Sequence, residues 1–208
     1  MNKYRKLIRG FSKIKGYDGW MIATAGLSGK KYGILADIDC NTEEIDDNVK
    51  TQILKQKFVM SVMQSSFDET FINMNIVKMH ENVDKYEIQN RFCGYKNYDN
   101  TDEYEEVCQM TFTVEEILNF VTEVKDDNYI HKTDVPVVPG FYILEKMLSA
   151  TDSFKDSERV VIKFRKPAYA GDIITVAGIK TDVTGREKYI GYVTEKGKDY
   201  ILWEMSIY

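Results

Sequence analysis

All three prolines of this chain lie between residues 136 and 167. Proline fixes φ near about −65° and has no backbone N–H, so it marks places where helices and strands start or stop. Pro136 and Pro139 enclose a short turn, and Gly140 directly after it opens an apolar stretch that predicts a helix to Ala150. Pro167 ends a predicted strand. The prolines therefore divide this part of the chain into a turn, a helix and a strand.

The segments around this unit complete a pattern of mixed helices and strands. Thr113 followed by Glu116 is a capping box, which predicts a helix from Thr113 to about Thr122. Runs rich in β-branched and aromatic residues predict four strands, at Val160–Pro167, Ile173–Ile179, Lys188–Glu195 and Tyr200–Ile207.

The first half has no prolines and is punctuated by glycines. Its patterns predict five strands, at Gly19–Gly26, Tyr32–Asp39, Phe71–Met79, Lys85–Cys93 and Tyr104–Phe112. Asn41 or Thr42 can cap a helix whose first turns are acidic. Apolar residues at broadly helical spacing extend this predicted amphipathic helix to about residue 65.

Each half can thus be interpreted as a central helix wrapped by a curved antiparallel sheet. This α+β arrangement is the hotdog fold, and the whole chain is expected to be a double hotdog with a divergent first half. The expected halves are residues 1–108 and 109–208. They share the order of their elements and no sequence motif.

Charge and cysteine content exclude several classes of protein. A formal net charge of −5 and a pI near 5.2 argue against binding of nucleic-acid phosphates. No apolar run approaches the roughly 20 residues of a membrane span, and the basic N-terminal segment lacks the apolar core of a secretory signal. Three widely spaced cysteines, Cys40, Cys93 and Cys108, suggest reduced thiols in a cytoplasmic protein.

The double-proline turn also carries chemically useful side chains. His131 precedes it, and Glu145 follows five residues after Gly140. The spacing His-x4-Pro-x2-Pro-Gly-x4-Glu resembles the β-hydroxyacyl-ACP dehydratases of fatty-acid synthesis. Downstream, residues 163–172 (Lys-Phe-Arg-Lys-Pro-Ala-Tyr-Ala-Gly-Asp) resemble that family's KFRxPVxPGD segment. The resemblance implies His131 and Glu145 as the acid–base pair, with Pro139, Gly140 and Phe141 lining the site.

A second resemblance overlaps the first. Asp126, Asn128 and His131 are similar to the DxNPxH pattern of MaoC-like hydratases, in which the aspartate and the histidine act on enoyl or 3-hydroxyacyl thioesters. This resemblance implies a catalytic role for Asp126 and substrate binding by Asn128. The chain departs from the pattern at Tyr129, where proline is expected, and at Lys125, where glycine is usual. Together the two resemblances cover residues 112–208, and the first hundred residues match neither motif.

The chemistry of dehydration explains these residue types. In dehydration, a proton leaves C2 of a 3-hydroxyacyl thioester. The hydroxyl group at C3 takes up a second proton and leaves as water. A neutral histidine, whose ordinary pKa is about 6.5, can act as the base. A nearby carboxylate can orient it or supply the second proton. The N–H of Gly140, in the first turn of a helix, can stabilise the negative charge that develops on the thioester oxygen.

The carboxylate partner of His131 depends on the assembly. If the two halves pair internally, the first half offers no second histidine for Glu145, and Asp126 is the better partner. If two chains pair through their second halves, His131 can meet Glu145 across the interface. We favour the internal pair, because a lone hotdog seldom leaves its sheet edges unpaired.

Two other functions fit the same fold. A thioesterase would use a carboxylate to activate water, and a non-catalytic hotdog would bind acyl thioesters or serve as a partner subunit. No metal or organic cofactor is implied, because neither histidine has ligand-like neighbours. The substrate is expected on coenzyme A or on an acyl carrier protein, which is acidic and could dock near Lys163, Arg165 and Lys166. His80 is expected at the surface and Asp172 in a structural turn.

Overall fold

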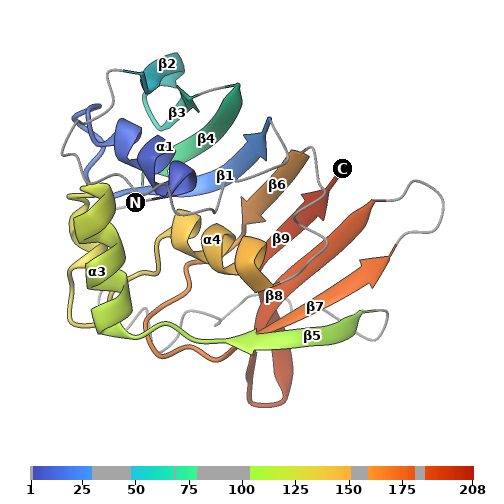
Figure 1. Ribbon diagram of the computed structural model, residues 1–208. Helices are drawn as coiled ribbons and strands as arrows, with labels where there is room; N and C mark the ends of the chain where they lie inside the picture. The colour runs from blue at the N-terminus through green and yellow to red at the C-terminus, as the bar shows by residue number, and fades with distance from the viewer. Residues whose placement is uncertain (1, 30–47, 68, 79–103, 151–158, 181–185) are drawn as a thin grey trace.

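The computed structural model describes residues 2–29, 48–67, 69–78, 104–150, 159–180 and 186–208. These residues form one antiparallel sheet of nine strands, in the order β2-β3-β4-β1-β6-β9-β8-β7-β5 (Figure 1). The strands are β1 Trp20–Ser28, β2 Lys50–Lys57, β3 Met60–Phe67, β4 Thr70–Lys78, β5 Glu105–Met110, β6 Arg159–Phe164, β7 Ile174–Lys180, β8 Glu187–Glu195 and β9 Lys198–Ile207. The helices are α1 Lys3–Phe11, α3 Val114–Val124 and α4 Gly140–Ala150, with a 3₁₀ turn, η2, at Tyr129–His131.

The strand order repeats across the sheet. From its centre outward, the second half runs β6-β9-β8-β7-β5 and the first half runs β1-β4-β3-β2. Helix α1 directly precedes β1 in the chain, just as α4 precedes β6, so each half has a helix followed by four strands in the same spatial order. Only β5 has no counterpart among the described strands of the first half. The chain therefore has the hotdog fold, with two helices along one continuous sheet.

The two halves meet where β1 pairs with β6, from Thr24 opposite Lys163 to Ser28 opposite Arg159. Strand β5 crosses the expected boundary after residue 108 and pairs with β7. It thus pairs within the sheet of the second half, and the division into domains 1–108 and 109–208 stays a prediction.

Helix α4 lies against the sheet of the second half (Figure 1). It is apolar around most of its circumference, which is typical of a helix enclosed by the rest of the fold. Its apolar residues are almost completely buried, namely Phe141, Tyr142, Ile143, Leu144, Met147 and Leu148. This burial fixes the helix, and hence the position of its first turn.

Helix α1 is an element that the sequence interpretation missed. The side chain of Asn2 accepts a hydrogen bond from the N–H of Arg5 and caps the helix. Tyr4, Leu7 and Ile8 are buried on one face. Their spacing, continued by Phe11, is the i, i+3, i+4, i+7 pattern of an amphipathic helix, so the signal was present in the sequence.

The predicted helix up to residue 65 is wrong from residue 50 onward, because β2 and β3 form a hairpin there. Alternate residues of β3 point inward, and these are Ser61, Met63 and Ser65. Two serines on the buried face remove the hydrophobic alternation that identifies a strand. Most residues of β2 are exposed on both faces of the strand. No alternation of buried apolar and exposed polar residues therefore marks β2 either.

The remaining described elements confirm the predictions within a few residues at their ends. These are strands β1, β4, β5, β6, β7, β8 and β9 and helices α3 and α4. The predicted strands at 32–39 and 85–93, the start of the predicted helix at residues 41–47, and His80 lie outside the described residues. Within the described ranges, every helix is too short or too polar to cross a membrane.

Candidate active site

The site begins at the C-terminal end of α3. The predicted capping box fixes the start of this helix, with Thr113 and Glu116 bonded to each other in both directions. Lys125 ends the helix in the left-handed conformation, with φ 56°. The N–H of Asp126 then donates to the carbonyl of Val121 over 2.8 Å, as in a helix-terminating turn. The end of α3 therefore fixes the position of the Asp126 backbone.

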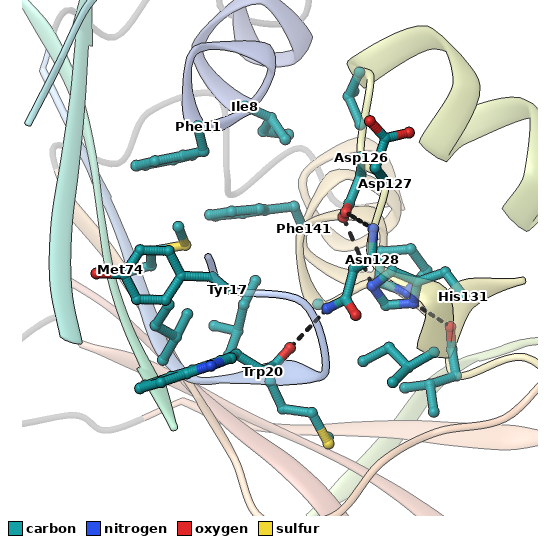
Figure 2. A pocket seen from close by; sticks show the side chains of 18 of the residues that line it. Ile8, Phe11, Tyr17, Trp20, Met74, Asp126, Asp127, Asn128, His131 and Phe141 are labelled. Atoms are coloured by element: carbon teal, nitrogen blue, oxygen red, sulfur yellow. Dashed lines mark hydrogen bonds and ion pairs between the residues drawn. The ribbon is translucent and has the colours of Figure 1, made fainter. Parts of the chain in front are cut away.

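Five residues further on, His131 faces Asp126. The Nε2 atom of His131 lies 3.7 Å from the Oδ2 atom of Asp126. The Nδ1 atom lies 2.7 Å from the carbonyl oxygen of Val137. A carbonyl can only accept, so Nδ1 carries the hydrogen, and in the neutral ring Nε2 keeps a lone pair directed toward Asp126. Figure 2 shows both contacts.

Burial keeps this imidazole neutral. His131 is only 6% exposed, and burial lowers its pKa below the ordinary value of 6.5, although the negative charge of Asp126 opposes this shift. The Asp126 side chain is about one-third exposed, at 34%. The pair thus combines a buried imidazole with a carboxylate that solvent can reach.

The double-proline turn is braced by the segment after β6. The N–H of Val138 donates to the carbonyl of Ala168, and the N–H of Ala170 donates to the carbonyl of Pro136, over 2.8 and 3.0 Å. Asp172 accepts a hydrogen bond from the N–H of Tyr169 over 2.8 Å. The two segments that resemble the ACP dehydratases therefore support each other, and Asp172 shapes the turn.

This bracing places Gly140 at the start of α4, against β1 and β6. A Cβ atom at residue 140 would lie 2.9 Å from two ring atoms of Phe164 and 3.4 Å from Cδ1 of Ile22. These neighbours leave little room for a side chain at residue 140, which favours glycine there. Because Gly140 opens the helix, its N–H has no acceptor inside α4. Gly140 also lines an open space in the structure.

That space is a cavity of about 370 Å³. Asp126, Asn128, His131 and Gly140 line it together with Pro139. Much of the remaining wall is apolar and comes from the first half, namely Ile8, Phe11, Ile14, Tyr17, Trp20, Ile22, Met63, Met74 and Ile76. Figure 2 shows the aspartates, Asn128 and His131 on one side of the cavity and the rings of Phe11, Phe141, Tyr17 and Trp20 on the other.

Phe141, a predicted substrate contact, lines the cavity from the first turn of α4. Its ring stacks on Phe11 of α1, with centroids 5.8 Å apart and planes inclined by 5°. Its carbonyl accepts a hydrogen bond from the buried hydroxyl of Tyr4 over 2.6 Å. The first half therefore supplies both cavity wall and support for α4, a contribution that motif reasoning did not find. The spacing of apolar residues in α1 was the signal for it.

Asn128 lines the same cavity, but its amide group holds the backbone of the first half. Its Oδ1 atom accepts from the N–H of Gly19, and its Nδ2 atom donates to the carbonyl of Trp20, each over 2.8 Å. The predicted binding of substrate by Asn128 stays a prediction. The bonds show that its amide fixes the loop from Asp126 to His131.

Glu145 is not brought to the cavity. It is 7% exposed and forms a bidentate ion pair with Arg5 of α1, with Nε to Oε1 at 2.9 Å and Nη2 to Oε2 at 3.0 Å. The Nη1 atom of Arg5 also contacts Glu123 of α3. Within one chain, Glu145 therefore links α4 to α1 through Arg5. The carboxylate beside His131 is that of Asp126.

Comparison with solved structures shows the same fold. The chain is similar to HtdX from Mycobacterium tuberculosis, with a TM-score of 0.63 and 9% identity over 99% of this chain and 87% of the other. It is also similar to a MaoC-like dehydratase from Phytophthora capsici, with a TM-score of 0.53 and 11% identity over 94% and 74% of the two chains. An acyl-ACP thioesterase from Bacteroides thetaiotaomicron matches with a TM-score of 0.49 and 8% identity over 90% and 75%. No protein-family model matches the sequence, and no curated protein matches it.

Proposed function

We propose that the protein interconverts trans-2-enoyl and 3-hydroxyacyl thioesters by adding and removing water. The observation that carries the proposal is the buried His131, whose Nε2 atom lies 3.7 Å from Oδ2 of Asp126 at the polar side of an otherwise largely apolar cavity. The separation is too long for a direct hydrogen bond, so both groups can contact one shared water or hydroxyl.

Hydration then proceeds through these two groups. A water molecule held by Asp126 loses a proton to Nε2 of His131, and its oxygen bonds to C3. The electrons of the C2–C3 double bond move toward the thioester oxygen, where the N–H of Gly140 stabilises the negative charge. The imidazolium returns its proton to C2. The carboxylate of Asp126 stabilises the imidazolium while it exists.

In the proposed reaction, the acyl chain lies along the apolar wall from the first half, and the thioester lies at the first turn of α4. The likeness in fold to a MaoC-like dehydratase is a reason to test hydration first. The carrier of the acyl group is coenzyme A or an acyl carrier protein in this proposal. Arg165, one of three predicted docking residues, is paired with Glu204 over 2.9 Å. Cytoplasmic location remains a prediction from the sequence.

The test is hydration of short and medium enoyl-CoA thioesters, followed by loss of the conjugated-thioester absorbance. Wild type should be active, and His131→Ala and Asp126→Asn should each lose about 10²- to 10⁴-fold in kcat/KM. Asp134→Asn is the matched control, because Asp134 is exposed and lies outside the residues that line the cavity. Equal rates for wild type and His131→Ala would refute the proposal. Release of free thiol from a saturated acyl-CoA would indicate a thioesterase, and binding without either reaction would indicate a non-catalytic hotdog.

A further inference from the structure

The loop that carries Asp126 and His131 is held by three consecutive residues of the first half. The N–H of Tyr129 donates to Oδ1 of Asp18 over 3.0 Å. The amide of Asn128 binds the next two residues, Gly19 and Trp20, over 2.8 Å each. These three bonds cross 108 to 111 positions of sequence.

The bond to Asp18 exists because residue 129 is not proline. A proline has no N–H to donate, and the MaoC-like pattern expects proline at this position. The side chain of Tyr129 contributes separately, since it lies over Gly19, where a Cβ atom would be 3.1 Å from Cε1 of Tyr129. Gly19 has φ +75°, so a residue with a side chain would be disfavoured there on both counts.

The segment that ends at Asp18 is also part of the cavity wall. Ile14 and Tyr17 line the cavity beside Asp18. Tyr17 is held from the other side, because its hydroxyl bonds with Ser61 of β3 over 3.1 Å, and its ring packs edge-on against Trp20 with centroids 5.1 Å apart. The segment therefore has one attachment to the sheet of the first half and another to the loop of the second.

We propose that Asp18 is a positioning residue, which fixes the loop Asp126–His131 against the cavity wall through the N–H of Tyr129. Among the described residues, its side chain accepts a hydrogen bond from Tyr129 and forms none with His131 or the Asp126 carboxylate, so it acts through the backbone between them. The kinetic part of this inference rests on the proposed function, but the geometric part does not.

Two pairs of variants separate the hydrogen bond from its surroundings. Asp18→Ala removes the acceptor, whereas Asp18→Asn keeps an oxygen that can accept. Tyr129→Pro removes the donor, whereas Tyr129→Ala removes the ring and keeps the N–H. Proline fits residue 129 because Asn128 before it is extended, with ψ 119°. Asp18 is exposed, so its variants should fold even if Tyr129→Pro does not.

The first readout is the pKa of His131 by NMR of ring-labelled protein. The chain has only two histidines, so the spectrum of His131→Ala assigns the signal. Burial is the largest cause of the lowered pKa, and the charges of Asp126 and Lys132 also act on the ring. A released loop admits water, so the pKa of His131 should rise toward 6.5 in Asp18→Ala and Tyr129→Pro and stay at the wild-type value in Asp18→Asn. The double variant Asp18→Ala/Tyr129→Pro should shift no further than either single variant.

The second readout is the hydration reaction. Loss of one hydrogen bond of about 1 kcal/mol predicts about a fivefold fall in kcat for Asp18→Ala, with KM nearly unchanged. Asp18→Asn should recover most of this loss. If Asp18→Ala leaves both the pKa of His131 and kcat at wild-type values, the positioning role is wrong. If no variant or wild type hydrates any enoyl thioester, the proposed function fails, and the NMR measurement still decides the role of Asp18.

Discussion

Helices α1 and α4 occupy equivalent places in the two halves of the sheet, and they serve different purposes. The first turn of α4 begins with Gly140, which lines the cavity. The first turn of α1 is capped by Asn2, whose side chain also donates to Glu145 over 3.2 Å. One helix start lines the cavity, and the other is capped by a side chain that also binds α4.

Several side chains of α1 support α4. Tyr4, Arg5 and Phe11 of α1 bind or stack on Phe141 and Glu145 of α4. The first half thus contributes packing and apolar wall, while the acid–base groups of the proposed reaction come from the second half.

Substitution at the start of α4 should give the largest effect. Gly140→Pro removes the N–H while keeping a backbone that suits the first position of a helix. It should lower kcat about 10²- to 10³-fold relative to Gly140→Ala, because both variants carry the Cβ atom near Phe164 and only one retains the donor. Steady-state hydration kinetics check this. Equal rates for the two variants would mean that the N–H of Gly140 has no part in the reaction.

The ion pair between the helices should matter for stability and not for chemistry. Glu145→Gln leaves the guanidinium of Arg5 with only the more exposed Glu123, and we expect a loss of about 2–4 kcal/mol in the free energy of unfolding. Glu123→Gln, at a side chain that is 38% exposed, should cost less than about 1 kcal/mol. Urea unfolding measures both values.

The kcat of Glu145→Gln also distinguishes the two possible assemblies, an internal pair of halves and a dimer of chains. If Glu145→Gln is destabilised but keeps wild-type kcat, the internal pairing of His131 with Asp126 is supported. A fall in kcat of more than about 10²-fold, in a protein that sedimentation shows to be a dimer, would instead favour His131 with Glu145 across an interface.

The wall from the first half should affect substrate length. Phe11→Ala removes one face of the Phe11–Phe141 stack, and we expect KM for a medium-chain enoyl-CoA to rise about tenfold, which corresponds to about 1.4 kcal/mol. KM for the four-carbon substrate should change little. Phe58→Ala is the control, since Phe58 is 91% exposed on the β2–β3 turn. An equal rise for both substrates would place Phe11 outside the acyl path.

The sequence predicted the parts of this site whose contacts are local. The capping box of α3, Asp126, His131 and the double-proline turn lie within about thirty residues, and each is recognisable from its own neighbours. The pairing of Asp126 with His131 was one of two alternatives, and it is the one that a single chain forms.

The parts that could not be predicted depend on distant contacts. Arg5 reaches Glu145 across 140 positions, and Tyr4 reaches Phe141 across 137. A glutamate in a motif looks the same in sequence whether it faces a histidine or an arginine. The β2–β3 hairpin was missed for another reason, because Ser61 and Ser65 are buried where apolar residues would have revealed the strand.

The smallest expected effect is a pH dependence of stability that arises in the second half. The pKa of His131 is lowered on folding, so the unfolded chain takes up a proton at a higher pH than the folded protein does. The contribution of His131 to stability is therefore complete above about pH 6.5 and is lost as pH falls below that value, with a slope of at most about 1.4 kcal/mol per pH unit. Urea midpoints at about pH 7.5 and about pH 5.5 should differ more for wild type than for His131→Gln. His80 is present in both proteins, so its contribution cancels.

In Asp126→Asn the negative charge that raises the pKa of His131 is gone, so the loss of stability with falling pH should extend to lower pH. If wild type and His131→Gln respond to pH alike, His131 is not held neutral by burial, and the base on which the proposed reaction depends is not prepared by the fold.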